Sequence, residues 1–262
     1  APSKGTVRVL GLDPLRERKK CAKQTAALFG QKNQLWWDLP VWDSIELVKY
    51  LYAIPASVFH ENYAYIDKYL NISEIKKIPV RQLSLGQRMR ANLCFALLHD
   101  PKIVFLDEPT IGLDILTKQQ VHDCIKEMNH NKGVTMILTT HDVSDIENLC
   151  KRVLLIDQGK IVFDNSLDHL KNDFVTNEGI LIKLCEGTDL ENVERMLLDF
   201  SIEFEKKDRN EYLLHVSRDV FWGSRLFFCL NESFAISSIM PANESLSVVL
   251  TKVYESIGKS AT

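Results

Sequence analysis

The sequence predicts an α/β fold with a mainly parallel sheet in its first half and a small α+β domain at its end. Short apolar runs at residues 103–106 (IVFL), 134–140 (VTMILTT) and 153–156 (VLLI) are typical of parallel strands buried on both faces. A helical pattern separates the first two runs. After Gly179, strand and helix patterns follow in the order βαββαβα, which fits a ferredoxin-like domain.

The first two apolar runs and the segment between them predict a βαβ unit. Asp114 is a suitable N-cap for the intervening helix, and Gly133 follows its end. Asp107 and Glu108 end the first strand, and His141 ends the second. Because parallel α/β sheets bind ligands at the carboxyl ends of their strands, we expect these three side chains to lie together at a ligand site.

Upstream of this unit the pattern is mostly helical. The chain opens with residues 5–11 (GTVRVLG), which we interpret as a strand, and residues 40–81 predict a helical insertion. The segment LSLGQRMRANL at 83–93 then has Ser84 at the expected start of a helix with an apolar face. Since helix N-termini favour negative charge, we expect LSLGQ to contact a phosphate.

The overall composition is that of an ordinary globular protein. Of 262 residues, 45% are hydrophobic and 26% charged, and the net charge is −3. This charge does not favour nucleic acid as a partner. No apolar run reaches the length of a membrane-spanning helix.

The run IVFLDE suggests phosphoryl-transfer chemistry. In that interpretation Asp107 holds Mg²⁺ and Glu108 polarises an attacking water. Taken alone, the run is also consistent with a strand that ends in a helix-capping acid. The neighbouring motifs decide between these interpretations: LSLGQ lies one helix upstream, PTIGLD follows directly, and TTHD ends the next strand.

In this order and spacing the motifs resemble those of ABC-type ATPases, from about Gly5 to Leu170. LSLGQ resembles the signature motif, FLDE the Walker B motif, IGLD the D-loop, TTHD the switch-histidine loop and FGQKNQLWWDLPV the Q-loop. More narrowly, the sequence resembles ATP-binding subunits of drug or ion exporters. The resemblance implies a P-loop NTPase-like ABC ATPase domain over residues 1–174, with a helical subdomain at about 40–98, and an accessory ferredoxin-like domain at 179–257.

The resemblance also implies roles for residues of one nucleotide site. Gln31 would contact Mg²⁺ and sense the nucleotide, with Gln34 as the alternative if the loop aligns one turn away. Asp107 would bind the metal, Glu108 would be the catalytic carboxylate, and His141 would contact the γ-phosphate of ATP.

Other residues are implied to act across a dimer interface. Asp114 would reach across the interface, while Ser84, Gly86 and Gln87 would contact ATP bound by a partner subunit. The family usually has glycine where this chain has Leu85. Trp36 and Trp37 belong to the segment that resembles the Q-loop. Two interpretations of these side chains remain open: they pack in the core, or they anchor a membrane subunit.

The P-loop of the family, GxxxxGK[ST], has no counterpart here. Gly258-Lys259-Ser260 is a chance match without a following helix. In the family the P-loop precedes the strand that GTVRVLG resembles, so we expect that the chain starts downstream of it and is inactive on its own. The implied function is ATP hydrolysis in an exporter, with a transmembrane permease and a second ATPase subunit as partners and a location on the inner face of the cell membrane. The alternative is a non-hydrolysing subunit that donates the signature motif to a competent partner.

Overall fold

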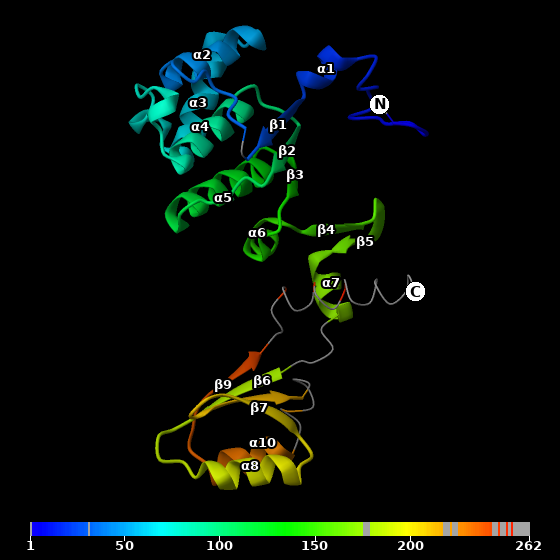
Figure 1. The fold of residues 1–262 in the computed structure, drawn as a ribbon, viewed down its shortest axis with the longest axis vertical. Coiled ribbons are helices and arrows are strands. Elements are labelled where there is room, and N and C mark those ends of the chain that lie inside the picture. The colour runs from blue at the N-terminus through cyan, green and yellow to red at the C-terminus, as the bar shows by residue number, and fades with distance from the viewer. Residues whose placement is uncertain are drawn as a thin grey trace. The chain divides into compact units, whose positions relative to one another are not determined.

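The structure is a computed structural model that describes residues 2–30, 32–174, 179–216, 221, 225–242, 246, 250 and 253. The chain divides into two compact units, residues 1–150 and 151–262, whose elements are labelled in Figure 1. The expected domain boundary at 174–179 lies within the second of these units and stays a prediction. Among the described residues, no helix combines the length and hydropathy needed to cross a membrane.

A three-stranded parallel sheet organises the first unit. Its order is β1 (Thr25–Phe29), β2 (Ile103–Asp107), β3 (Thr135–Thr139), which confirms the first two predicted apolar strands. The register pairs Phe29 with Asp107 and Asp107 with Thr139. All three strands therefore end at one level, and the loops that follow them form a common carboxyl edge.

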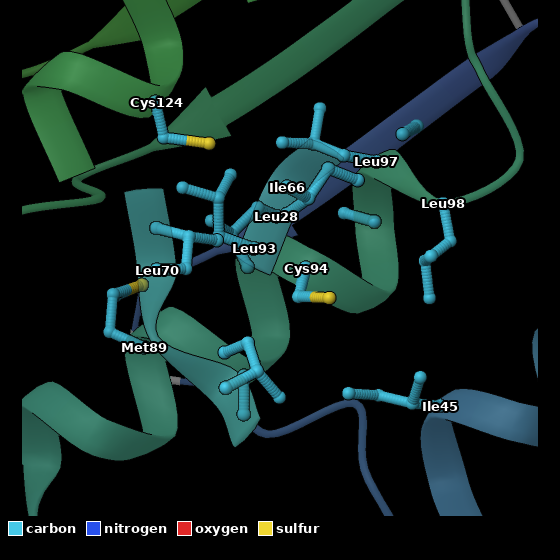
Figure 2. Close-up of a cluster of buried hydrophobic side chains, with 14 of the residues drawn as sticks. Leu28, Ile45, Ile66, Leu70, Met89, Leu93, Cys94, Leu97, Leu98 and Cys124 are labelled. Atoms are coloured by element: carbon cyan, nitrogen blue, oxygen red, sulfur yellow. The ribbon is translucent and has the colours of Figure 1, made fainter. Parts of the chain in front are cut away.

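Helices of the predicted insertion pack with this sheet in one core. The helices of the unit are α1 (Arg18–Ala22), α2 (Val41–Leu51), α3 (Ala56–Leu70), α4 (Leu85–Leu97), α5 (Ile115–His130) and α6 (Val143–Leu149), with 3₁₀ turns at Ile72–Glu74 and Val80–Gln82. Leu93 and Leu97 of α4 are buried beside Leu28 of β1 (Figure 2). The apolar face predicted for the LSLGQ helix is thus confirmed, and burial of such side chains stabilises the unit by about 2 kcal/mol each.

The two expected helix starts are confirmed at the level of single hydrogen bonds. Ser84 is the N-cap of α4: its side chain accepts from the backbone N–H of Gln87, and the Gln87 side chain accepts from the N–H of Ser84. Asp114 is the N-cap of α5 and accepts from the N–H of Thr117. Both caps satisfy backbone donors that have no partner within the helix.

The prediction that the parallel strands are buried on both faces is wrong. One face of the sheet packs in the core through residues such as Val104 and Leu106, whereas Phe29, Phe105 and Ile137 on the other face are each more than two-fifths exposed. Apolar runs alone do not distinguish a strand covered on both faces from one covered on a single face, because the cover comes from elsewhere in the fold.

The strand expected at residues 5–11 is also not formed. In that region the structure has one isolated bridge between Val9 and Leu12. Val7 is about half exposed, so the alternating pattern there has no buried face to support a strand.

The second unit starts with a hairpin. Strand β4 (Arg152–Asp157) pairs antiparallel with β5 (Lys160–Ser166), and α7 (Leu167–Phe174) follows. The residues Asp157-Gln158-Gly159-Lys160 also predict a hairpin turn after VLLI, and this turn is confirmed. VLLI at 153–156, however, is not the third parallel strand that we expected. A short connection can only join neighbouring strands in antiparallel order, and it determines the pairing here.

An α+β arrangement completes the described part of the second unit. Its elements are β6 (Gly179–Leu184), α8 (Leu190–Asp199), β7 (Glu203–Asp208), β8 (Glu211–His215), α10 (Arg225–Ser233) and β9 (Ile236–Ala242). The strands form an antiparallel sheet in the order β7-β8-β6-β9. The sheet and both helices share a core that includes Ile180, Leu197 and Leu230. Residues 175–178, which separate the two predicted domains, lie outside the described residues. So do most of residues 244–256, where the last helix of the βαββαβα pattern is expected.

Candidate functional site

The carboxyl edge of the parallel sheet brings the predicted acids and histidine together. Asp107 is the last residue of β2, and its Oδ1 accepts a hydrogen bond of 2.5 Å from the Thr139 hydroxyl on the neighbouring strand. Glu108 follows Asp107, and its N–H donates to the carbonyl of Thr139 at 2.9 Å. Asp107 is exposed, so its carboxylate is open to a ligand above the sheet edge.

Glu108 and His141 form a direct contact. His141 Nδ1 lies 2.7 Å from Glu108 Oε1, and the two side chains are 74% and 30% exposed. The hydrogen bond and the negative charge of Glu108 raise the pKa of His141 above its ordinary value. The pair is therefore a solvent-accessible carboxylate–imidazole unit, and its imidazole is the kind of group that exchanges protons near neutral pH.

The backbone of Glu108 adopts an unusual conformation. Its φ of +49° lies in the left-handed region, which costs a residue with a side chain about 1 kcal/mol. Gly30, directly after β1, lies so close that a Cβ there would be 2.3 Å from the carbonyl oxygen of Glu108. Only glycine fits this approach, so residue 30 belongs to the construction of the site.

The N-terminus of the LSLGQ helix is close-packed against the D-loop side of the same unit. A Cβ on Gly86 would be 2.9 Å from Thr117 Cγ2, and a Cβ on Gly112 would be 3.0 Å from Leu85 Cδ2. Gly86 thus allows α4 and α5 to approach. Leu85, which replaces the usual glycine of the motif, packs towards Gly112 in the D-loop.

Hydrogen bonds within the chain engage Asp114 and Gln34. The Asp114 carboxylate accepts from the N–H and the hydroxyl of Thr117 at 3.0 and 2.7 Å, which lowers the pKa of Asp114. The side-chain amide of Gln34 donates to the carbonyl of Ala27 in β1 at 2.6 Å. Gln31 lies outside the described residues, so its predicted contact with Mg²⁺ stays a prediction.

The two tryptophans after the Q-loop segment lie at the surface. Trp36 and Trp37 are 44% and 48% exposed, and the Arg88 guanidinium lies 5.3 Å from the centre of the Trp37 ring. Packing as ordinary core residues does not describe either side chain.

A second histidine–carboxylate pair near this edge was missed by the sequence analysis. His122 Nε2 lies 2.9 Å from Asp145 Oδ1, and their side chains are 4% and 0% exposed. Lys118 and His122 lie four residues apart on α5, which places both on one face of the helix. That spacing was the available signal for a buried polar cluster, but no nearby residue in the sequence identifies Asp145 as the partner of His122.

The donor set of the edge fits Mg²⁺ with a nucleotide phosphate. Mg²⁺ binds carboxylate oxygens and usually completes its coordination with phosphate oxygens and waters rather than a protein cage. Asp107 supplies such an oxygen. Within the described ranges, no group of three or more His, Cys, Asp or Glu side chains has the arrangement of a metal cage.

Comparison with known proteins agrees with this geometry. Residues 1–111 match the family model of the ABC transporter. The probable multidrug ABC transporter ATP-binding protein YbhF of Escherichia coli is 32% identical over 177 residues, which are 68% of this chain and 30% of that protein. The chain spans between about a fifth and a half of the length of the first curated relatives that it matches.

Two solved structures share the fold. The cbiO1 protein of Clostridium perfringens, part of the ABC transporter complex cbiONQ, matches 76% of this chain and 74% of its own with a TM-score of 0.58 and 22% identity. The ATP-binding cassette MJ0796, solved as a dimer bound to ADP and Pi, matches 63% of this chain and 75% of its own with a TM-score of 0.55 and 23% identity. These two structures show the fold. The family-model match and the curated relatives, which agree with the ordered motifs, show that the chain belongs to the ABC transporter family of ATP-binding proteins.

Proposed function

We propose that the chain forms the hydrolytic part of an ATP-hydrolysing subunit of an ABC exporter. The observation that carries this proposal is the 2.7 Å contact between Glu108 Oε1 and His141 Nδ1 at the exposed carboxyl edge of the sheet. A carboxylate placed beside an imidazole, one residue after an exposed metal-binding acid, provides the groups that hydrolysis of a phosphoanhydride needs.

Each group at the edge has a distinct task in this proposal. Asp107 would hold Mg²⁺, which would supply charge neutralisation at the phosphates of ATP. Glu108 orients the attacking water and accepts its proton. His141 keeps the Glu108 side chain in place and, when protonated, presents a positive charge to the γ-phosphate. Gln31 is proposed to contact Mg²⁺ and sense the nucleotide.

The signature motif is proposed to act on ATP held by a second ATPase subunit, in a head-to-tail dimer. The Ser84 hydroxyl accepts the N–H of Gln87 at 3.2 Å and keeps its own hydrogen for a further bond. Gln87 likewise uses its side-chain oxygen internally and keeps its NH₂ group. With Gly86 beside them, these donors surround the positive end of α4, where a phosphate is favoured.

Two exposed apolar side chains support the proposed dimer. Ile115 and Leu116, directly after Asp114, are 86% and 78% exposed. Adjacent apolar side chains that are so open to water favour an interface, and Asp114 would then reach the partner subunit. The dimeric cassette MJ0796 is the solved relative that resembles such an assembly.

A transmembrane permease is the other proposed partner. The exposed rings of Trp36 and Trp37 supply an amphipathic contact surface of the kind that interfaces favour. A subunit docked on a permease through them would lie on the inner face of the cell membrane. Similarity to a probable multidrug transporter protein supports export. The βαββαβ order of the second unit supports a ferredoxin-like accessory domain at 179–257 that regulates or dimerises.

Mixing two inactive variants tests the function and the dimer together. In the full-length protein that contains this chain, Ser84→Arg blocks the donated signature and Glu108→Gln blocks the hydrolytic carboxylate. A heterodimer of the two pairs one intact Glu108 with one intact Ser84. We expect each variant alone to be inactive, and an equal mixture to recover up to about a quarter of the parent rate of ATP hydrolysis, since half of the dimers are mixed and each has one intact site of two.

Ser84→Asp controls for helix stability. Aspartate caps a helix as well as serine does, but its charge repels a phosphate, so it should behave as Ser84→Arg does while it melts like the parent. A mixture without any activity contradicts a signature that acts in trans. Full hydrolysis by Glu108→Gln alone contradicts the proposed carboxylate. Absence of hydrolysis in the parent protein alone favours the non-hydrolysing subunit that only donates its signature.

A further inference from the structure

The buried carboxylate of Asp145 connects the two loops that carry Glu108 and His141. Asp145 lies in the first turn of α6 and is fully buried. Its Oδ2 accepts from the hydroxyl of Thr110, two residues after Glu108, and from that of Thr140, directly before His141. One carboxylate oxygen thus holds both active-site loops.

The other oxygen of Asp145 fixes the carboxylate to α5. Oδ1 lies 2.9 Å from His122 Nε2 and 3.1 Å from Lys118 Nζ. An ionised carboxylate only accepts hydrogen bonds, so His122 carries its hydrogen on Nε2. Although burial opposes the charged form, the hydrogen bonds from Thr110, His122 and Lys118 hold the pKa of Asp145 below its ordinary value.

Thr140 has one hydrogen to give and two carboxylates within reach. Its Oγ1 is 3.1 Å from Asp145 Oδ2 and 3.5 Å from Glu108 Oε2, and it accepts the N–H of Asp142 at 3.0 Å. The shorter contact favours donation to Asp145. Oε2 of Glu108 is therefore not occupied by the Thr140 hydroxyl. A carboxylate that accepts a proton from water needs such an available oxygen.

The strained backbone of Glu108 needs such an anchor. A residue with φ of +49° persists only where the surrounding structure holds it from several sides. The N–H of Glu108 is held by Thr139, and the N–H of Ile111 returns to the carbonyl of Glu108 at 3.4 Å. The bond from Thr110 to Asp145 fixes the middle of this short turn.

We propose that Asp145 is a positioning residue for hydrolysis, which sets the Glu108 and His141 loops relative to each other through Thr110 and Thr140. The proposal rests on the proposed function of Glu108 and His141. It makes Asp145 a residue that contacts neither water nor nucleotide and still determines the rate of the chemical step.

The first test measures the loops in the chain itself and needs no hydrolysis. Asp145→Asn keeps the shape of the side chain and loses its charge, while Thr110→Val keeps the shape of Thr110, changes no charge and loses the hydroxyl. We expect the backbone amides of Ile111 and Asp142 to exchange their hydrogens about fivefold faster in both variants, the effect of losing one net hydrogen bond. Unchanged exchange at both amides overturns the proposal.

Two controls separate this network from stability in general. Thr110→Ser keeps the hydroxyl and should exchange like the parent. Asp142→Asn removes the second acid that pairs with Lys118, at 2.6 Å, but it keeps the N-cap of α6 and touches no hydroxyl of Thr110. The Ile111 amide should therefore exchange more slowly in Asp142→Asn than in Asp145→Asn. Equal rates in the two variants would mean that the unpaired charge on Lys118, and not the loss of the loop contacts, causes the faster exchange.

The second test measures hydrolysis in the full-length protein. For Asp145→Asn and Thr110→Val we expect kcat to fall about tenfold while KM for ATP stays within about twofold, because positioning changes the chemical step and not binding. Thr110→Ser should recover the parent kcat. Equal losses in Thr110→Ser and Thr110→Val, or a parent kcat in both Asp145→Asn and Thr110→Val, overturn the proposal.

The two tests also distinguish this proposal from the proposed function. If the parent protein does not hydrolyse ATP, the proposed function fails, and the exchange measurement still decides whether Asp145 holds both loops. If Asp145→Asn does not fold, Thr110→Val and Thr110→Ser carry both tests, since neither introduces an unpaired buried charge.

Discussion

Two histidine–carboxylate pairs of nearly equal length lie near the same edge of the sheet, and they differ in almost everything else. His141 and Glu108 are 2.7 Å apart and 74% and 30% exposed, whereas His122 and Asp145 are 2.9 Å apart and buried. The exposed pair has unused hydrogen-bonding capacity. Each oxygen of the buried Asp145 carboxylate has two donors within hydrogen-bonding distance. The carboxylate therefore has no hydrogen-bonding capacity left for a substrate.

The difference shows how burial assigns chemistry to identical groups. A buried charge is tolerated only when its hydrogen bonds are complete, so Asp145 acts through structure. An exposed pair is screened by solvent and contributes little to stability, so Glu108 and His141 are available for proton transfer. Three predictions test this division, from the largest expected effect to the smallest.

The largest effect is expected on hydrolysis from the exposed pair. Glu108→Gln in the full-length protein should lower kcat for ATP at least about 100-fold, the contribution of a general base, while nucleotide affinity changes little because the amide is nearly isosteric. Release of phosphate and equilibrium binding of ATP measure the two quantities. A loss of binding equal to the loss of rate would mean that Glu108 holds the nucleotide instead.

The second prediction concerns stability. Here we expect the buried pair, and not the exposed pair, to give the larger effect when its carboxylate is removed. Asp145→Ala leaves the buried donors of Thr110 and His122 without their acceptor and should lower the free energy of unfolding by about 3 kcal/mol. Glu108→Ala should leave the denaturant midpoint of the same unit almost unchanged. Chemical denaturation of both variants checks this, and equal midpoints would show that the buried pair is not the structural one.

The smallest effect is the pH dependence of the exposed pair. Since Glu108 raises the pKa of His141 above its ordinary 6.5, the contact is complete below that pH and is lost as pH rises through the raised value. NMR titration of the His141 ring should give a midpoint above 6.5, and Glu108→Gln should return the midpoint towards it. An ordinary midpoint in the parent would contradict a persistent contact in solution.

Much of the candidate site could be predicted from the sequence because its signals are local. The N-caps at Ser84 and Asp114 and the strand that ends at Asp107 each depend on residues within one turn or one strand. The meeting of Glu108 with His141 followed from a general rule about parallel strands. The carried-over roles of these residues stay predictions until hydrolysis is measured.

Other features could not be predicted because their partners are distant in the chain. The contacts of Asp145 with His122 and Thr110 span 23 and 35 positions, and no periodicity encodes such a pairing. The open face that exposes Phe105 likewise depends on which elements lie alongside the sheet.

The sequence by itself determined the family, the helix starts and the order of the chemical groups along the sheet edge, since spacing and capping are properties of neighbouring residues. Only the tertiary structure decided which acid is buried and which is open to water. Whether a carboxylate is a structural anchor or a reactive group depends on how many donors the surrounding chain brings to it. At Asp145 the fold brings four, and at Glu108 it leaves the side chain about one-third exposed.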